Sequence, residues 1–488
     1  MGESKYSPVP VELVTMTAGS SRAHLYQSAF ILNLIYLMCG TMFAWSSPIL
    51  VKLSHLDDAE GSVVTSMLAL GSVLGPVVCG AVADLLGHKG SVVLCMTLMT
   101  LSWLLLTLFP GLVMLSVGRF IAGVSVGIAF TALPTYIAEI SEDSVRGLLN
   151  TLSQTFCCSG SLMMYTVGPF VSYATLHYIV LGLCGLFFIL FPLLPNSPYF
   201  LIMKKNDIKQ ARNTLTWLRG YKSDSLCESE LQLIQVTISQ SLKEKGTISM
   251  LFSTSGNRRA LAICCILLWL QQISGISIIV CYAEKIFQMT GSTISSSTCS
   301  IVIGLIMTVS GFICPVVVKY FGYKKPLLIS SSGMAFGMGG LGAFFLLKTN
   351  HFEIDNITWL PLLSVVLYIF FFNIGLANIP WALSGELFPS NIKSYATTII
   401  ASSSGVVAFL TTNLFPDMVN LLGLDFLFMS CSFACIFTVV FVSLVVQDTS
   451  GLSFQEIQLI LNGAKRKNLE VKPSSMRNCE IVINSTIA

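Results

Sequence analysis

Twelve long apolar runs dominate this chain of 488 residues and restrict what it can fold into. Crossing the hydrocarbon core of a bilayer takes about 20 residues of helix, and the backbone must satisfy its own hydrogen bonds there. The chain is 54% hydrophobic and only 10% charged, against roughly 25% charged in an average soluble chain. The sequence therefore predicts an all-α membrane protein with twelve transmembrane helices. The runs, numbered here as spans 1 to 12, occupy 28–50, 62–83, 90–110, 112–136, 148–171, 178–195, 260–288, 294–318, 326–347, 361–385, 394–417 and 422–446.

A polar segment divides these spans into two six-helix halves, 28–195 and 260–446. In this linker, 196–259, apolar residues recur at helical spacing, which predicts short amphipathic helices on a membrane surface. The tails comprise 1–27 and 447–488. The first tail lacks a cleavable apolar core, so we expect span 1 to act as the targeting element.

Lysine and arginine are unevenly distributed between the two sides of the predicted membrane domain. The side with both tails and the linker carries 23 of the 27, the other side carries only Lys52, Lys285 and Lys348, and Arg119 lies within span 4. Because cytoplasmic loops are rich in these residues, we expect both termini to be cytoplasmic, in a protein of the plasma membrane. Asn356 then begins a glycosylation sequon in an outer loop.

Similar charged turns recur at equivalent places in the two halves. Span 2 ends in the string DLLGHK, which begins at Asp84, and span 8 ends in KYFGYK, which begins at Lys319, with glycine at the same offset of a tight turn. Spans 4 and 10 each end in an acid followed seven residues later by a base: Glu139 with Arg146, and Glu386 with Lys393. Duplicated halves are typical of transporters. The alternative explanation is topology alone, with bases marking the inner side and acids pairing with them locally.

Two adjacent glutamines interrupt span 7 in the string LAICCILLWLQQISGISIIVCY, 261–282. Polar side chains within a span are unfavourable unless they face protein, water or a ligand. Gln271 and Gln272 each offer one carbonyl acceptor and two amide donors, and Ser277 adds a hydroxyl. These groups suit a polyhydroxylated solute, and interhelical hydrogen bonding is the alternative.

The string QQISGIS, followed by Cys281 and Tyr282, resembles the span 7 signature of the sugar porter family of the major facilitator superfamily. In that family the tandem glutamines contact the sugar. The resemblance covers nearly all of 28–460, and Ser47-Pro48 resembles the insect facilitated trehalose transporters in particular. Further matches are GRF at 118–120, PTYIAE at 134–139, Arg146-Gly147, Gln154, PNSPYFL at 195–201 and the closing motif at 448–457.

Span 10 contains the stretch GLANIPW, 375–381, which resembles the family's GPGPIPW. Proline removes a backbone donor and breaks the helix, so carbonyl groups become available at mid-membrane. Trp381 offers a flat apolar face to a sugar ring. The alternative is a kinked helix with Trp381 as an interfacial anchor.

Several residues depart from the family pattern and reduce the polarity of the expected pocket. Ser277 stands for an asparagine, Cys281 for an aromatic residue, Met307 for Asn or Gln, and Ser404-Gly405 for Asn-Trp. We expect Asn373 in span 10 to supply one of the lost contacts.

The resemblance implies a facilitative carrier of a hexose or a trehalose-like disaccharide, in which the two halves rock about a central site. The implied sugar contacts are Gln154, Gln271, Gln272, Ser277, Asn373 and Trp381. The implied cytoplasmic gate comprises Asp84, Arg119, Glu139, Arg146, Lys319, Glu386 and Lys393. The expected partners are the sugar and the lipid bilayer, and the oligomeric state stays open.

Two other functions remain as alternatives. The changed motifs motivate one of them, a sugar sensor that has kept the fold but lost transport. A proton-coupled sugar or polyol symporter is less well supported, since span 1 contains no Asp or Glu and coupling needs a buried ionisable group. The sequence indicates no enzyme, cofactor or metal site, and the net charge of +3 is too small to suggest nucleic acid.

Overall fold

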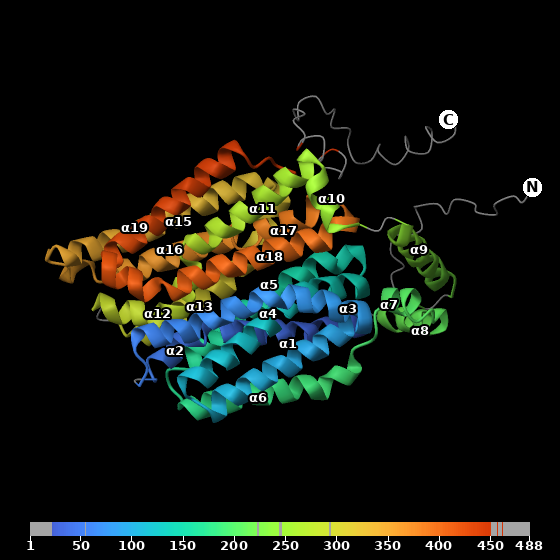
Figure 1. Ribbon diagram of the computed structural model, residues 1–488, viewed down its shortest axis with the longest axis horizontal. Coiled ribbons are helices and arrows are strands. Elements are labelled where there is room, and N and C mark those ends of the chain that lie inside the picture. Colours follow the sequence, from blue (N-terminus) through green and yellow to red (C-terminus); the bar gives the residue numbers. More distant parts are fainter. Residues whose placement is uncertain are drawn as a thin grey trace, which may run out of the picture.

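The computed structural model describes residues 22–53, 55–221, 224–243, 246–291 and 294–449, together with Glu456 and Leu461. Within these residues the regular structure is entirely helical. Figure 1 shows two helical bundles side by side, the N-terminal half in blue to green and the C-terminal half in yellow-green to red. The linker helices all lie at the same end of these bundles, which we call the linker end, and we call the opposite end the distal end.

The described part of the N-terminal half consists of six α-helices and contains the first of the two glycine turns that the sequence predicts. Its helices are α1 (Ala23–Ala44), α2 (Ser46–Leu50), α3 (Asp58–Leu108), α4 (Leu112–Ile140), α5 (Asp143–Val167) and α6 (Tyr173–Leu190), followed by the 3₁₀ turn η2 (Phe191–Leu193). The long α3 contains spans 2 and 3, joined by a turn at Gly87 with φ 73° and ψ 175°. Gly322 makes the matching turn after span 8, with φ 73° and ψ −161°. Only glycine adopts such angles without strain, so the predicted pair of tight turns is confirmed.

In the C-terminal half, three spans are broken into two helices each. The helices are α11 (Ser255–Ile273), α12 (Ile276–Thr290), α13 (Ser296–Gly311), α14 (Ile313–Phe321), α15 (Lys324–Thr349), α16 (Leu360–Ile374), α17 (Ile379–Glu386), α18 (Ser390–Asn413) and α19 (Phe415–Leu444), with η3 (Asp355–Ile357) before α16. Span 7 breaks at Gly275, which has φ 96°, between α11 and α12. Span 10 breaks at 375–378, directly before Pro380, as the proline predicted.

The fold class is confirmed. Ten helical stretches of the described residues are long and apolar enough to cross a bilayer. The stretch Asp58–Leu108 has 51 residues and supplies two spans, because it turns at Gly87. The more polar α5, with 25 residues, is the twelfth. The helices extend past the apolar runs, so that α1 begins at Ala23 and not at residue 28, because polar residues continue a helix beyond the hydrocarbon.

Short helices occupy the linker: α7 (Pro198–Met203), α8 (Ile208–Arg219), α9 (Asp224–Lys243) and α10 (Ile248–Ser253). The predicted short helices are thus present, and the first three bury a small core of their own that includes Leu201, Ala211, Leu215 and Leu231. Arg219 anchors α8 to the N-terminal half, because its Nη1 donates to the carbonyl of Ile140 at 2.6 Å.

The two halves meet mainly along two pairs of helices, α3 with α18 and α5 with α13, and α12 adds smaller contacts with α1 and α2. Small residues allow the first contact: Gly405 of α18 lies against Ser72 and Val73 of α3, and the Ser402 hydroxyl donates to the Val73 carbonyl at 2.8 Å.

Candidate functional site

Gln271 binds the broken segment of span 10. Its side chain is only 4% exposed, and its Nε2 donates to the carbonyls of Leu376 at 2.7 Å and Ala377 at 3.3 Å. In a regular helix the carbonyl of Leu376 would accept from the amide four residues later, but that residue is Pro380, which has no N–H. The carbonyl of Leu376 therefore lacks its helical donor, as the proline predicted, and the Gln271 side chain supplies a donor in its place. Gln271 thus makes interhelical hydrogen bonds between α11 and the broken segment of span 10.

Gln272 is placed differently from its neighbour. Its side chain is half-buried, and its Oε1 accepts from the hydroxyl of Ser277 at 2.8 Å. Its Nε2 lies 3.4 Å from both Gln271 Oε1 and Ser404 Oγ. These two contacts are long beside the usual N–H···O distance of about 2.9 to 3.0 Å. The Gln272 amide nitrogen is therefore only weakly held by these two partners.

The network also contains a residue that sequence reasoning counted as a loss. Ser404 of α18 stands where the sugar porter pattern has asparagine, yet its hydroxyl lies against the Gln272 amide. In the sequence, the pattern that could have indicated this contact is the run of three serines at 402–404 within an apolar span. Ser274, one turn from the glutamines, instead bonds to the hydroxyl of Tyr368 at 2.9 Å within the C-terminal half.

The other predicted contacts are not joined to this network by the hydrogen bonds described. Gln154 of α5 is half-buried and its Nε2 lies 3.7 Å from Cys158 Sγ. Trp381 of α17 is 40% exposed. Asn373 is 1% exposed and donates to the hydroxyl of Ser310 at 2.9 Å. Asn373 thus faces α13, beside the position of Met307, and burial separates it from solvent.

At the distal end, hydrogen bonds and an ion pair join the two halves. α12 departs from helical geometry at Tyr282, with φ −119° and ψ 17°. Two residues further on, the amide of Glu284 donates to the hydroxyl of Ser47 in α2 at 3.1 Å. We call the crossing contacts the distal junction: Ser47 with Glu284, Asp58 with Lys285, Ser66 with Asn413, and Tyr165 with Val280.

At the linker end, the described pairs lie within one half. His88 Nε2 lies 3.4 Å from Glu139 Oε1 in the N-terminal half. In the C-terminal half the Tyr323 hydroxyl donates to Glu386, and the Tyr323 amide donates to Asp448 Oδ1 at 3.2 Å. Burial, together with the Glu386 carboxylate, raises the pKa of Tyr323, so this phenol stays a donor.

The remaining members of the predicted gate are placed as follows. Asp84 and Lys393 are exposed at the linker end, and Lys393 lies within electrostatic range of Glu386. The side chains of Arg146 and Lys319 lie outside the described part of the structure.

Arg119 lies apart from the other described residues of the predicted gate. It precedes Glu139 by 20 residues of the same helix, which is about 30 Å at 1.5 Å per residue. Arg119 is fully buried near the distal end, where its Nη1 donates to the carbonyl of Met42 at 2.6 Å and its guanidinium lies 5.0 Å from the centre of the Trp45 ring. It ties α4 to α1 and α2 within the N-terminal half.

Comparison with known proteins decides the family. The family model described as "Sugar (and other) transporter" matches residues 16–461. The chain belongs to the sugar transporter family. Among its relatives, the facilitated trehalose transporter Tret1 of Culex quinquefasciatus is 30% identical over 448 residues, which cover 90% of this chain and 86% of the relative. Tret1 of Bombyx mori is 29% identical over 454 residues, covering 92% of this chain and 89% of the relative.

Solved structures show the same fold for this member of the sugar transporter family. The proton:xylose symporter XylE bound to 6-bromo-6-deoxy-D-glucose matches with a TM-score of 0.74 at 20% identity, over 90% of this chain and 99% of that one. The inward-open xylose transporter XylE from E. coli also has a TM-score of 0.74, at 21% identity, over 89% and 99%. The expected major facilitator fold is confirmed, and the protein is a multi-pass membrane transporter of this family.

Proposed function

We propose that this protein is a facilitative carrier of a small carbohydrate, a hexose or a trehalose-like disaccharide, that works by alternating access of its two halves. Membership of the sugar transporter family supports this, as do the relatives that are named facilitated trehalose transporters. The observation that carries the proposal is the weakly held amide of Gln272, backed by the hydroxyls of Ser277 and Ser404.

The two glutamines have different roles in this proposal. The amide of Gln271 already serves the carbonyls of Leu376 and Ala377, so we assign it to positioning the break in span 10. Gln272 and Ser277 are half-buried and contact the sugar. Gln154 and Trp381 complete the contact set, whereas Asn373 supports α13 from its buried position.

Substitution of each glutamine tests this assignment. One hydrogen bond lost in a desolvated site is worth about 1 to 3 kcal/mol, so Gln272→Leu should reduce uptake of the transported sugar by roughly tenfold or more. Surface expression of that variant should be unchanged. Gln271→Leu is the matched variant, and it should lower expression or thermal stability because a buried carbonyl loses its donor. Normal uptake per surface molecule in Gln272→Leu would assign both glutamines to structure.

We place the linker end in the cytoplasm, the distal end outside the cell and the protein in the plasma membrane. The distribution of lysine and arginine supports this orientation. With the distal junction formed, the structure then corresponds to a carrier closed to the outside. Asn356 is exposed in the loop before α16, in a position to accept a glycan on the outer side.

Proton-coupled symport is the second candidate, and one observation favours it. Span 1 has no acid, but Glu284 at the distal end of span 7 is only 5% exposed. Its Oε1 accepts from the hydroxyl of Ser297, and its Oε2 is buried without a partner among the described residues. A buried carboxylate of this kind can carry a proton.

Proteoliposomes distinguish the candidates. A uniporter should only equilibrate a labelled hexose or trehalose, with or without an inward proton gradient. Accumulation that an uncoupler abolishes, and that Glu284→Gln also abolishes, would establish symport. Specific sugar binding without any uptake across a panel of labelled sugars would instead identify a sensor.

A further inference from the structure

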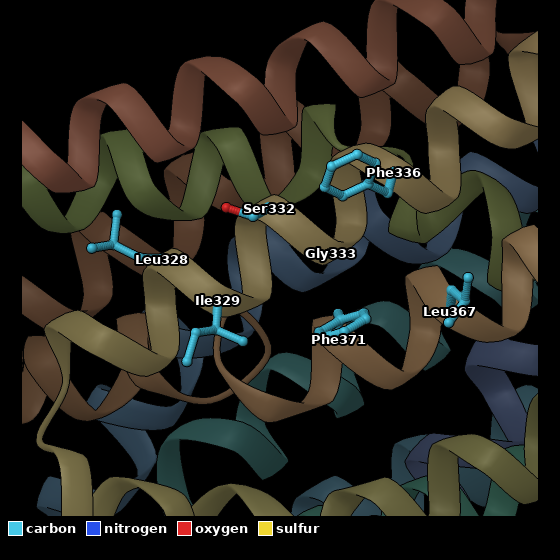
Figure 2. A pocket seen from close by; sticks show the side chains of 7 residues that line it. All are labelled: Leu328, Ile329, Ser332, Gly333, Phe336, Leu367 and Phe371. Atoms are coloured by element: carbon cyan, nitrogen blue, oxygen red, sulfur yellow. The ribbon is translucent and has the colours of Figure 1, made fainter.

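An apolar groove of about 430 Å³ lies between α15 and α16 in the C-terminal half (Figure 2). Its lining includes Ile329, Ser332 and Phe336 of α15 and Phe371 of α16. A Cβ at Gly333 would lie 2.1 Å from Cγ of Phe371, so the absence of a side chain at this residue makes room for that ring. The Phe371 ring can therefore lie against the backbone of α15.

The groove faces the lipid. α15 packs mainly on α16 and α19, on the side of the C-terminal half away from the N-terminal half (Figure 1). Within this span, Phe336 is 80% exposed and Ile329 is 52% exposed. At the depth of the hydrocarbon core, side chains with this exposure are covered by lipid chains or by another protein.

A lysine stands at the linker end of the groove. Lys325 is exposed in the first turn of α15, and Ile329, Ser332 and Phe336 follow it by four, seven and eleven residues, which places all four on one helix face. The groove residues thus lie about 6 to 17 Å from Lys325 along the helix, within one leaflet of a hydrocarbon core about 30 Å thick.

The two lysines at the start of α15 differ in their surroundings. Lys324 bonds within the protein, whereas Lys325 extends toward the lipid headgroups. Lys324 donates to the carbonyl of Ser443 in α19 at 2.9 Å. Side chains on a helix lean toward its N-terminus, and α15 begins at the linker end, so the ammonium group of Lys325 extends out of the groove toward the membrane surface.

We propose that this groove binds an anionic phospholipid of the leaflet on the linker side, with one acyl chain along α15 and α16 and the phosphate paired with Lys325. The charge at the mouth of the groove selects an anionic headgroup over a neutral one. The apolar floor beside Gly333 and Phe371 takes the chain. This lipid site is separate from the network of Gln272 and does not depend on which sugar is transported.

Native mass spectrometry of the purified full-length protein tests whether the charge of Lys325 selects an anionic lipid. The probes are phosphatidylserine and phosphatidylcholine with identical acyl chains. Wild type should retain phosphatidylserine preferentially, and Lys325→Gln should weaken its binding by about fivefold, the value of one lysine near an anionic headgroup. Lys325→Arg should keep the preference. Lys209→Gln, which removes an exposed lysine of the linker helix α8, is the matched control and should change nothing.

A second pair of variants tests the groove itself. Ser332→Phe fills the space beside Phe371 and should remove the tightly retained phosphatidylserine. Ser430→Phe makes the same change on the exposed face of α19, between Phe426 and Phe433, and should leave retention as in wild type. Melting temperatures of both variants verify that they are folded.

Three results would overturn the proposal. One is equal retention of phosphatidylserine by wild type, Lys325→Gln and Ser332→Phe. Another is labelling of the α15 and α16 peptides by a photoactivatable sterol but not by photoactivatable phosphatidylserine. The third is a dimer of wild type that Ser332→Phe dissociates, which would mean that a second copy of the chain covers the groove.

Discussion

The two ends of the membrane bundle are held together in different ways. At the distal end, contacts of the distal junction run from one half directly to the other. At the linker end, the described pairs of His88 with Glu139 and of Tyr323 with Glu386 each stay within a half. The distal end is therefore closed by contacts that must break when the halves separate, whereas the linker-end pairs can survive that movement.

This difference shows what determines the resting state of the carrier. A net hydrogen bond contributes about 0.5 to 1.5 kcal/mol, and two states of a carrier differ by only a few kcal/mol. A handful of contacts present in one state alone can therefore set the balance. Changes at the distal junction should shift the populations, and similar changes within a half should not.

The largest effect is expected for Tyr165→Phe. The Tyr165 hydroxyl donates to the carbonyl of Val280 at 2.7 Å, both residues are buried, and the bond crosses between the halves. An unpaired carbonyl in the closed state costs about 1 to 3 kcal/mol, so the population with an open distal end should rise by roughly tenfold. Thr412 is buried in α18 beside Asn413 of the distal junction, so a cysteine at this position reports opening of the distal end. The measurement is the labelling rate of Thr412→Cys by an impermeant thiol reagent, in a background without accessible native cysteines.

Tyr368→Phe is the matched control for that measurement. Its hydroxyl bonds to Ser274 at 2.9 Å within the C-terminal half, so the labelling rate should stay at the wild-type value. Equal acceleration by both substitutions would remove the distinction between contacts across the halves and contacts within them.

A smaller effect is expected for Lys285→Asp, which breaks the ion pair with Asp58 across the distal junction. Asp58 is well exposed, and exposed pairs are worth about 0.2 to 1 kcal/mol. The labelling rate of Thr412→Cys should rise by at most about fivefold, and less at high salt, because salt screens such pairs. The charge-swapped double variant Asp58→Lys with Lys285→Asp should restore the slow rate. Failure of the swap to restore it would show that the ion pair does not hold this end.

At the linker end, Lys319→Glu should create a contact between the halves. The resemblance to sugar porters places an acid at this position, near the arginine that Arg146 resembles, whereas this chain has two cations. The new pair should favour closure of the linker end and raise labelling at Thr412→Cys by at most about fivefold. Glu139, Glu142 and Asp143 lie near Arg146 in the sequence and reduce the gain. Unchanged or slower labelling would mean that other contacts hold this end.

The smallest effect on transport is expected for Asn356→Gln, which tests which end is extracellular. If the distal end lies outside the cell, the wild-type protein should carry a glycan that an endoglycosidase removes, with a visible shift on a gel. The variant should run at the deglycosylated position and transport normally. Glycosylation only at sites engineered into the linker end would reverse the assignment of the two ends.

Much of the fold follows from the sequence, because its rules act over short distances. Twelve apolar runs define twelve spans, since a helix must cross the hydrocarbon with every backbone group paired. Gly87 and Gly322 mark matching turns because their positive φ suits glycine alone. Pro380 predicts the break in span 10, because it cannot donate to the carbonyl four residues earlier.

Only the tertiary structure separates the roles of residues that look equivalent in the sequence. Gln271 and Gln272 are neighbours, but successive side chains on a helix point about 100° apart, and the broken segment of span 10 lies on the Gln271 side. Arg119 has no charged neighbour in span 4 to show what it contacts, and its partners come from α1 and α2. Ser404 contacts Gln272 from a helix more than 100 residues away in the chain. Periodicity predicts which face of a helix is polar, but the partner of that face depends on how the helices pack.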